Sequence, residues 1–151
     1  MTDIDHTPEL PLPSRTLSAY LLGTLEFDEL LAFQRRLVYE IGGEPSAAAL
    51  LLCDHPPGIT IGREGSRTHV RPNPEELHAR GWPVRWVSRG GGVMLHMPGQ
   101  VACYPIIPLD TLKLTAAAYI LELQEVACEL CREYDVPAEA GHYKPRTKKL
   151  L

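Results

Sequence analysis

A short glycine-rich segment carries the residue types in this chain that are best suited to holding a ligand. Arg89 precedes three consecutive glycines, and His96 follows them after three apolar residues. Consecutive glycines can adopt positive φ and let another molecule approach the main chain closely. An arginine beside them offers a planar cation that suits a carboxylate or a phosphate. The segment is therefore either a ligand cradle or a mobile hairpin connection, and composition alone leaves both open.

The four cysteines offer thiol or metal chemistry, but their spacing supports neither. Cys128 and Cys131 form a C-x-x-C inside a helical pattern, and no second pair or nearby histidine completes a zinc set. Without a secretory signal, reduced thiols are favoured over disulfides. Cys53 and Cys103 lie in apolar, strand-like runs, and we expect both in the core. The sequence predicts no metal and no cofactor.

Length and composition indicate an ordinary globular chain. With 151 residues, 44% hydrophobic and 23% charged, it fits one domain. A formal charge of −4 gives no reason to expect a nucleic-acid partner, and no apolar run approaches the ~20 residues of a membrane span. The acidic, proline-rich start resembles neither a signal nor a transit peptide, so we expect a cytoplasmic protein. Residues 1–14 are predicted to be a disordered tail, and residues 15–151 a single domain.

Hydrophobic spacing and Gly/Pro punctuation predict an alternation of short strands and helices. One helix is expected over 27–41 and should end at Gly42 and Gly43. A second is expected over 74–80, with Asn73 as its N-cap, and a third from Thr115 onward. Strands are expected over 17–22, 47–53, 59–61, 83–87 and 101–108. Mixed hairpins and separate helices favour an α+β or mixed α/β fold over a doubly wound one. Neither a G-x-G-x-x-G nor a Walker motif follows a strand.

Several short motifs, in this order, resemble the lipoyl(octanoyl) transferases of the lipoate-protein ligase B family. The resemblance runs from about residue 17 to residue 137. Each piece alone is weak, and the ordered set is specific. The motifs are Leu22-Gly23, Gln34 to Val38, Leu50 to Pro57, Ile59 to Arg63, Arg89-Gly90-Gly91, His96, Pro98 to Gln100 and Tyr104-Pro105.

The resemblance implies both a fold and an activity. The fold would be a mixed sheet flanked by helices, like that of biotin and lipoate protein ligases, and incomplete at the C-terminus. Residues 15–151 would then be the N-terminal part of a single catalytic domain of this kind. The activity would be an octanoyltransferase of protein lipoylation, which moves octanoate from acyl carrier protein to a lysine through a cysteine thioester. Its partners would be octanoyl-acyl carrier protein and the lipoyl domains of 2-oxoacid dehydrogenases or the glycine cleavage H protein.

The resemblance also implies an acyl-substrate site, formed by Arg89, Gly90, Gly91, Gly92, Val93, Met94, Leu95 and His96. A medium acyl chain needs an apolar slot, and the three residues before His96 can supply part of it. His96 either holds the shape of the loop by a hydrogen bond or does acid–base work, and the first reading is at least as well supported. His55 and Arg63 are expected to shape the neighbouring turns.

The chain departs from the family pattern inside this segment. Gly92 stands where the family usually has Gln, Met94-Leu95 where it has Thr-Tyr, and Met97 where it has Gly. These changes make the predicted pocket wall more apolar and remove two hydroxyls. They bear on acyl chain length and polar contacts.

The larger departure is beyond the long helix. The family's lysine lies in a Gly-x-Lys-Ile-Ala segment and its nucleophilic cysteine in a Pro-Cys-Gly-like segment, and neither occurs in this sequence. No catalytic residue is therefore assigned. The residues after Ala140 resemble a shifted reading frame or an abrupt end, and we expect the 151 residues alone not to catalyse octanoyl transfer.

Three functions stay open from the sequence. The first is an octanoyltransferase, shortened at its C-terminus. The second is a non-catalytic acyl- or partner-binding fragment of the same fold. The third is an ATP-dependent lipoate ligase, which the ordered Arg-Gly-Gly, His and Pro-Gly-Gln frame fits less well.

Overall fold

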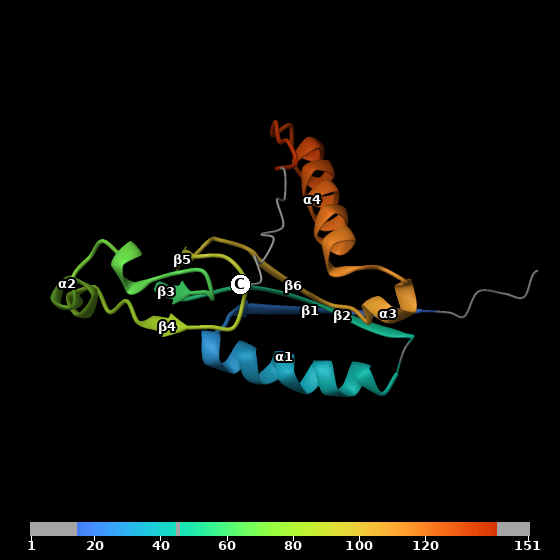
Figure 1. The fold of residues 1–151 in the computed structure, drawn as a ribbon, viewed down its shortest axis with the longest axis horizontal. Coiled ribbons are helices and arrows are strands. Elements are labelled where there is room, and N and C mark those ends of the chain that lie inside the picture. The colour runs from blue at the N-terminus through green and yellow to red at the C-terminus, as the bar shows by residue number, and fades with distance from the viewer. Residues whose placement is uncertain (1–14, 45, 142–151) are drawn as a thin grey trace, which may run out of the picture. The chain divides into compact units, whose positions relative to one another are not determined.

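The computed structural model describes residues 15–44 and 46–141, and its contacts group them into two compact units. The first unit ends at Ile107 and the second begins at Pro108. Figure 1 labels their elements along the chain. The tail predicted over residues 1–14 lies outside the described residues, and the single domain over 15–151 stays a prediction.

The first unit contains two mixed sheets of three strands each. In one sheet β2 (Ala47–Asp54) lies between β1 (Thr16–Thr24), which is parallel to it, and β6 (Ala102–Ile106), which is antiparallel. In the other, β3 (Gly58–Ile61) lies between the parallel β4 (Val84–Trp86) and the antiparallel β5 (Val93–His96). The predicted mixed α/β class is confirmed, with two small sheets in place of one.

Helix α1 (Phe27–Gly42) packs on one face of the β1-β2-β6 sheet and builds the larger core (Figure 1). Its buried residues are spaced three, seven and four apart, as one face of a helix requires. They pack against every second residue of β2, because strand side chains alternate between the two faces of a sheet. The buried cluster is Leu30, Leu37, Ile41, Ala49, Leu51 and Cys53. The predicted helix is confirmed, although Val38, which the same apolar spacing includes, is 58% exposed.

The second sheet has a core of its own beside the short helix α2 (Pro74–Ala79). Asn73 and Glu76 form a reciprocal capping box, in which each side chain accepts from the other residue's backbone N–H at 2.9 Å. A short 3₁₀ turn, η1 (Arg67–His69), precedes this helix. The core comprises Ile59, Ile61, Val70 and Leu77. The predicted N-cap at Asn73 is confirmed.

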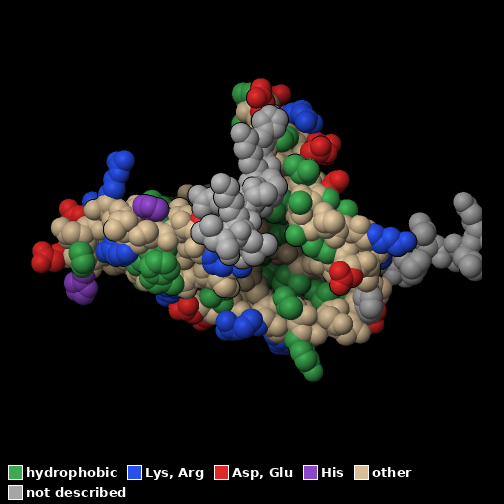
Figure 2. Space-filling model, in the orientation of Figure 1, with side chains coloured by type: hydrophobic (Ala, Val, Ile, Leu, Met, Phe, Trp, Pro, Cys, Tyr) green, Lys and Arg blue, Asp and Glu red, His purple; other side chains and the backbone are tan. Residues whose placement is uncertain are grey.

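The second unit consists of α3 (Leu109–Leu112) and the long helix α4 (Ala116–Glu133). The Thr115 side chain accepts a hydrogen bond from the Ala118 N–H at 3.1 Å, so the predicted cap is confirmed. Cys128 is buried, whereas Leu130 and Tyr134 are 54% and 74% exposed. Figure 2 shows hydrophobic side chains along this helix. No described helix is long and apolar enough to cross a membrane.

The cysteines are free thiols in different surroundings. Cys53 is buried, as expected, but Cys103 is exposed, so its predicted place in the core is wrong. Cys103 lies on the face of β6 that α1 does not cover, because it alternates with Tyr104, which packs against the core. Cys128 is buried and Cys131 half-buried on α4. Within the described ranges no three His, Cys, Asp or Glu side chains gather as a metal site.

Candidate functional site

The predicted glycine-rich loop is a tight turn followed by a strand. The turn ends at Gly92, and Val93 to His96 form β5, paired antiparallel with β3 from Ile61 back to Gly58. The prediction of a loop through His96 is therefore wrong for its second half. Gly91 has φ +75°, which only glycine adopts at little cost.

A second glycine turn, directly after β3, interlocks with the first. The N–H groups of Gly62, Arg63 and Glu64 donate to the carbonyls of the first turn at 2.9, 3.0 and 3.1 Å. A Cβ at Gly62 would lie 2.5 Å from the Gly91 carbonyl oxygen, so no larger residue fits there. These bonds fix the turn, which speaks against a mobile connection. Arg63 shapes this turn through its backbone, as expected.

The Arg89 side chain binds protein groups. Its Nη2 donates to the Thr60 carbonyl at 3.0 Å and to the Thr60 hydroxyl at 2.8 Å, and its Nη1 donates to the Gly90 carbonyl at 3.0 Å. The guanidinium therefore ties the glycine turn to β3. Its planar fork reaches both sites at once, which a lysine could not do.

Two histidines approach each other between the sheets. His55, 3% exposed, has Nδ1 at 2.7 Å from the Leu25 carbonyl oxygen and Nε2 at 2.9 Å from the Tyr104 hydroxyl. A carbonyl only accepts, so Nδ1 carries the proton and Nε2 accepts from Tyr104. His96 Nε2 lies 2.9 Å from the Thr60 hydroxyl. Burial, His55 and Arg89 together lower the pKa of His96 below its usual 6.5, so His96 is neutral at pH 7.

Sequence reasoning missed the importance of His55, which was expected only to shape a turn. Its partners lie 30 residues before it and 49 residues after it, so no local pattern reveals them. The one available signal was a histidine between a buried strand and two prolines, where backbone donors are missing.

Phe27, His55 and His96 form a cluster of three rings, here called the three-ring wall. The ring centroid of Phe27 lies 5.2 Å from that of His55 and 5.4 Å from that of His96. The centroids of the two imidazoles are 5.4 Å apart. These spacings are typical of packed aromatic rings. All three residues line both of two cavities in the first unit.

The larger cavity, of about 660 Å³, lies between the glycine turn, β5 and β6. It is deep at the wall, where Phe27 is 9% exposed, and open at Val101, which is 78% exposed. Its remaining apolar lining includes Met94 and Leu95. The full lining is Phe27, His55, Arg89, Met94, Leu95, His96, Met97, Gln100, Val101, Ala102, Cys103 and Tyr104.

The predicted substrate-site residues divide between this cavity and its support. Arg89, Met94, Leu95 and His96 line the cavity. Val93 instead packs with the core of the second sheet. The three glycines form the interlocked turn that sets where β5 begins.

The turn between β5 and β6 fixes the open end of the cavity. Gly99 has φ +84°, and its N–H donates to Asp54 Oδ2 at 3.3 Å. The Gln100 side chain accepts from the Met97 N–H at 3.0 Å. The predicted Pro98 to Gln100 motif thus holds the mouth of the cavity in place.

Comparison with known protein families shows to which family the chain belongs. Residues 27–147 match the model of the lipoyl protein ligase A/B catalytic domain. This chain belongs to that family. The larger cavity is built from residues within this matched range.

Relatives of the lipoyl protein ligase A/B family include named octanoyltransferases. One from Chloroflexus aggregans is 35% identical over 125 residues, which cover 83% of this chain and 57% of the relative. The mitochondrial octanoyl-[acyl-carrier-protein]:protein N-octanoyltransferase LIPT2 of Xenopus tropicalis is 36% identical over 124 residues, covering 78% and 51%. The chain thus spans about half the length of the curated relatives it matches.

Solved structures agree with the fold of this family. Protein Ta0514 of T. acidophilum, described as a candidate lipoate protein ligase, superposes with a TM-score of 0.63 at 14% identity, covering 88% of this chain and 54% of Ta0514. The same protein with bound lipoic acid gives 0.60 at 16% identity, covering 83% and 51%. At these identities the likeness shows the fold alone, and it confirms the predicted lipoate-ligase-like architecture.

Proposed function

We propose that this chain forms the acyl-donor-binding part of an octanoyltransferase of protein lipoylation. Such an enzyme moves an octanoyl group from acyl carrier protein to a lysine of a lipoyl domain through a cysteine thioester. Membership of the family and the names of its relatives support this choice. The acceptors would be lipoyl domains of 2-oxoacid dehydrogenases or the glycine cleavage H protein. A cytoplasmic location, expected from the sequence, stays a prediction.

The observation that carries the proposal is the larger cavity. Its volume of about 660 Å³ falls within the range of about 300–1,000 Å³ usual for small-molecule sites. Met94, Leu95 and Val101 give it apolar sides, as an alkyl chain requires. At its deep end His55 is hydrogen-bonded to Tyr104 and His96 to Thr60, and the Arg89 guanidinium is hydrogen-bonded to Thr60 and Gly90.

The size of the donor sets the direction in which the acyl group enters. A carrier protein cannot pass into the cavity, so the thioester lies at the mouth near Val101 and the tail points toward the three-ring wall. Met94, Leu95 and His96 would contact the acyl chain directly. Arg89 and the three glycines would support the site by holding β5 against β3.

The chemical step itself needs groups that the family places in two motifs absent from the printed sequence. A cysteine thiolate attacks the thioester carbonyl and releases the carrier thiol, and the lysine amine of the acceptor then displaces the cysteine. No described residue is assigned to either role. The property proposed for these 151 residues is therefore recognition of the donor.

Calorimetric titration with two forms of acyl carrier protein tests this proposal. One form carries octanoate on its phosphopantetheine thiol, and the other carries the free thiol. We expect the octanoyl form to bind more tightly, because each methylene that enters the cavity gains about fourfold in affinity. Leu95→Asp should remove the difference, since it places a charge on the cavity side.

Leu21→Asp is the matched control, because Leu21 is 80% exposed and does not line the cavity. This variant should keep the difference between the two carrier forms. Equal binding of both forms by the unmodified chain would contradict the proposal. Formation of an acyl-adenylate from free octanoate and ATP would instead support the ligase alternative.

A further inference from the structure

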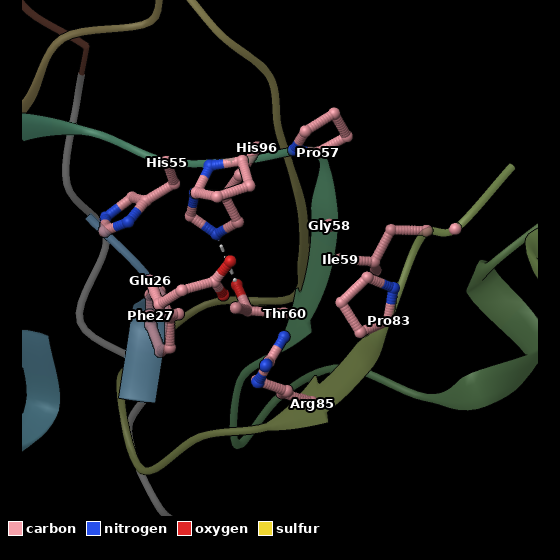
Figure 3. A pocket seen from close by; sticks show the side chains of 12 residues that line it. Glu26, Phe27, His55, Pro57, Gly58, Ile59, Thr60, Pro83, Arg85 and His96 are labelled. Carbon is pink, nitrogen blue, oxygen red and sulfur yellow. Dashed lines mark hydrogen bonds between the residues drawn. The ribbon is translucent and has the colours of Figure 1, made fainter. Parts of the chain in front are cut away.

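The larger cavity shares the three-ring wall with a second cavity. Phe27, His55 and His96 line both the larger cavity and a smaller cavity of about 180 Å³. Figure 3 shows the three rings along one side of the smaller cavity, facing Ile59 and Pro83. A tail that passed between these rings would therefore enter the smaller cavity on its side lined by Ile59 and Pro83.

The three rings are not held in the same way. His55 is tied at both ring nitrogens, to Leu25 and Tyr104, and His96 is tied to Thr60. Phe27 is the first residue of α1, and its side chain has no polar atom, so packing alone holds the ring. Removing its ring leaves the hydrogen bonds of both histidines in place. Phe27 therefore helps to close the wall but does not hold either histidine in place.

Beyond the wall the lining is mainly apolar next to the rings. Pro57, Ile59 and Pro83 lie there, and Ile59 is 5% exposed. The charged Arg85 also lines this cavity, but its guanidinium is paired with Asp28, with Nε and Oδ2 3.1 Å apart. Glu26 also lines this cavity, so an alkyl chain finds apolar contacts there mainly along Pro57, Ile59 and Pro83.

We infer that Phe27 is a specificity-determining residue that limits the length of the acyl chain. This inference rests on the proposed function. The tail of a medium-chain acyl group runs from the mouth to the Phe27 ring and stops there. Further methylenes of a longer chain find no buried space and contribute no affinity. With the Phe27 ring removed, the two cavities join and the longer tail extends toward Ile59.

Binding of two thioesters, octanoyl-pantetheine and dodecanoyl-pantetheine, tests the inference in the full chain. The quantity measured is the ratio of their dissociation constants, octanoyl over dodecanoyl. Phe27→Ala should raise this ratio at least tenfold over the unmodified chain. Burial of all four added methylenes would give about two hundredfold, at about fourfold for each. Thermal unfolding of each variant establishes that it is folded.

Phe33→Ala is a closely matched control. It removes the same ring from the same helix, but Phe33 packs edge-to-face on Tyr20 and lines neither cavity. It should lower stability and leave the ratio unchanged. A merely structural role for Phe27 would make the two variants behave alike.

The outcomes separate this inference from the proposed function. A folded Phe27→Ala with a ratio within twofold of the unmodified chain would overturn the inference alone. If that variant does not fold, Phe27→Leu decides, with an expected rise of at least threefold, and an unchanged ratio overturns the inference. Failure of the unmodified chain to bind either thioester would overturn both.

Discussion

His55 and Tyr104, 49 residues apart in the chain, are joined by a hydrogen bond of 2.9 Å between Nε2 and the phenol oxygen. Because the Leu25 carbonyl fixes the imidazole proton on Nδ1, Tyr104 must be the donor. Burial raises the pKa of Tyr104 to about 12, so the phenol keeps its proton at physiological pH. The pair joins the end of β2 to β6 at the deep end of the larger cavity.

Tyr104→Phe should destabilise the chain by about 1–3 kcal/mol, because it leaves the buried His55 Nε2 without its donor. The loss should fall near the lower end, since the Cys53 thiol lies 3.7 Å from the same nitrogen. Urea unfolding measures the change. Tyr39→Phe is the control, because Tyr39 is 85% exposed and its loss should stay within about 0.5 kcal/mol. Equal effects of the two variants would argue against a structural hydrogen bond.

Stability should depend on pH through His96. Its folded pKa is lowered, chiefly by burial, so the unfolded chain binds more protons below the usual 6.5. This contribution to stability is complete above about pH 7 and is lost as the pH falls through 6.5 toward the folded pKa. NMR titration of the imidazole carbon-bound protons, with and without urea, measures both pKa values. A folded pKa at or above the unfolded one would be inconsistent with a half-buried, neutral His96.

Gly91→Val should destabilise the glycine turn. Gly91 has φ +75°, where an L side chain costs roughly 1–2 kcal/mol and a β-branched one more. Gly92→Ala is the control, because a Cβ there meets no atom within 4 Å and should change stability by less than about 0.5 kcal/mol. Denaturant unfolding compares the two, and similar losses would show that the positive φ is not what matters.

Arg89→Ala should weaken both folding and donor binding. Arg89 belongs to the implied acyl-substrate site, and the structure also gives it three guanidinium hydrogen bonds to Thr60 and Gly90. Charge-assisted bonds of this kind suggest a loss of about 2 kcal/mol in stability. Arg89→Lys should not restore it, because an ammonium cannot replace the planar fork. If Arg89→Ala were as stable as the unmodified chain, the structural role of Arg89 would be contradicted and a role in ligand binding would be favoured.

Local signals in the sequence predicted most of the elements. Asn73, Pro74 and Glu76 together encode the capping box of α2, and apolar spacing from Phe27 to Ile41 encodes α1. In each case the partners lie within a few residues of one another. The mixed α/β class followed from the order of these elements.

Contacts across the chain were not predictable in the same way. The hydrogen bonds of His55 are made to residues far away in sequence. The three glycines before Val93 favour a loop, so the start of β5 at Val93 was not predicted. Cys103 was placed in the core because its run is apolar, although α1 covers only the other face of β6. Residue types revealed the ligand-binding segment, whereas the depth of the cavity and its wall required the packed sheets.

The location of a bound acyl chain tests the central claim most directly. A crystal structure of the chain with octanoyl-pantetheine would show where the tail lies. We predict the terminal methyl within about 4.5 Å of the Phe27 ring, the thioester near Val101, and the chain along Met94 and Leu95. A tail lying outside the cavity, or a thioester at the three-ring wall, would contradict the account.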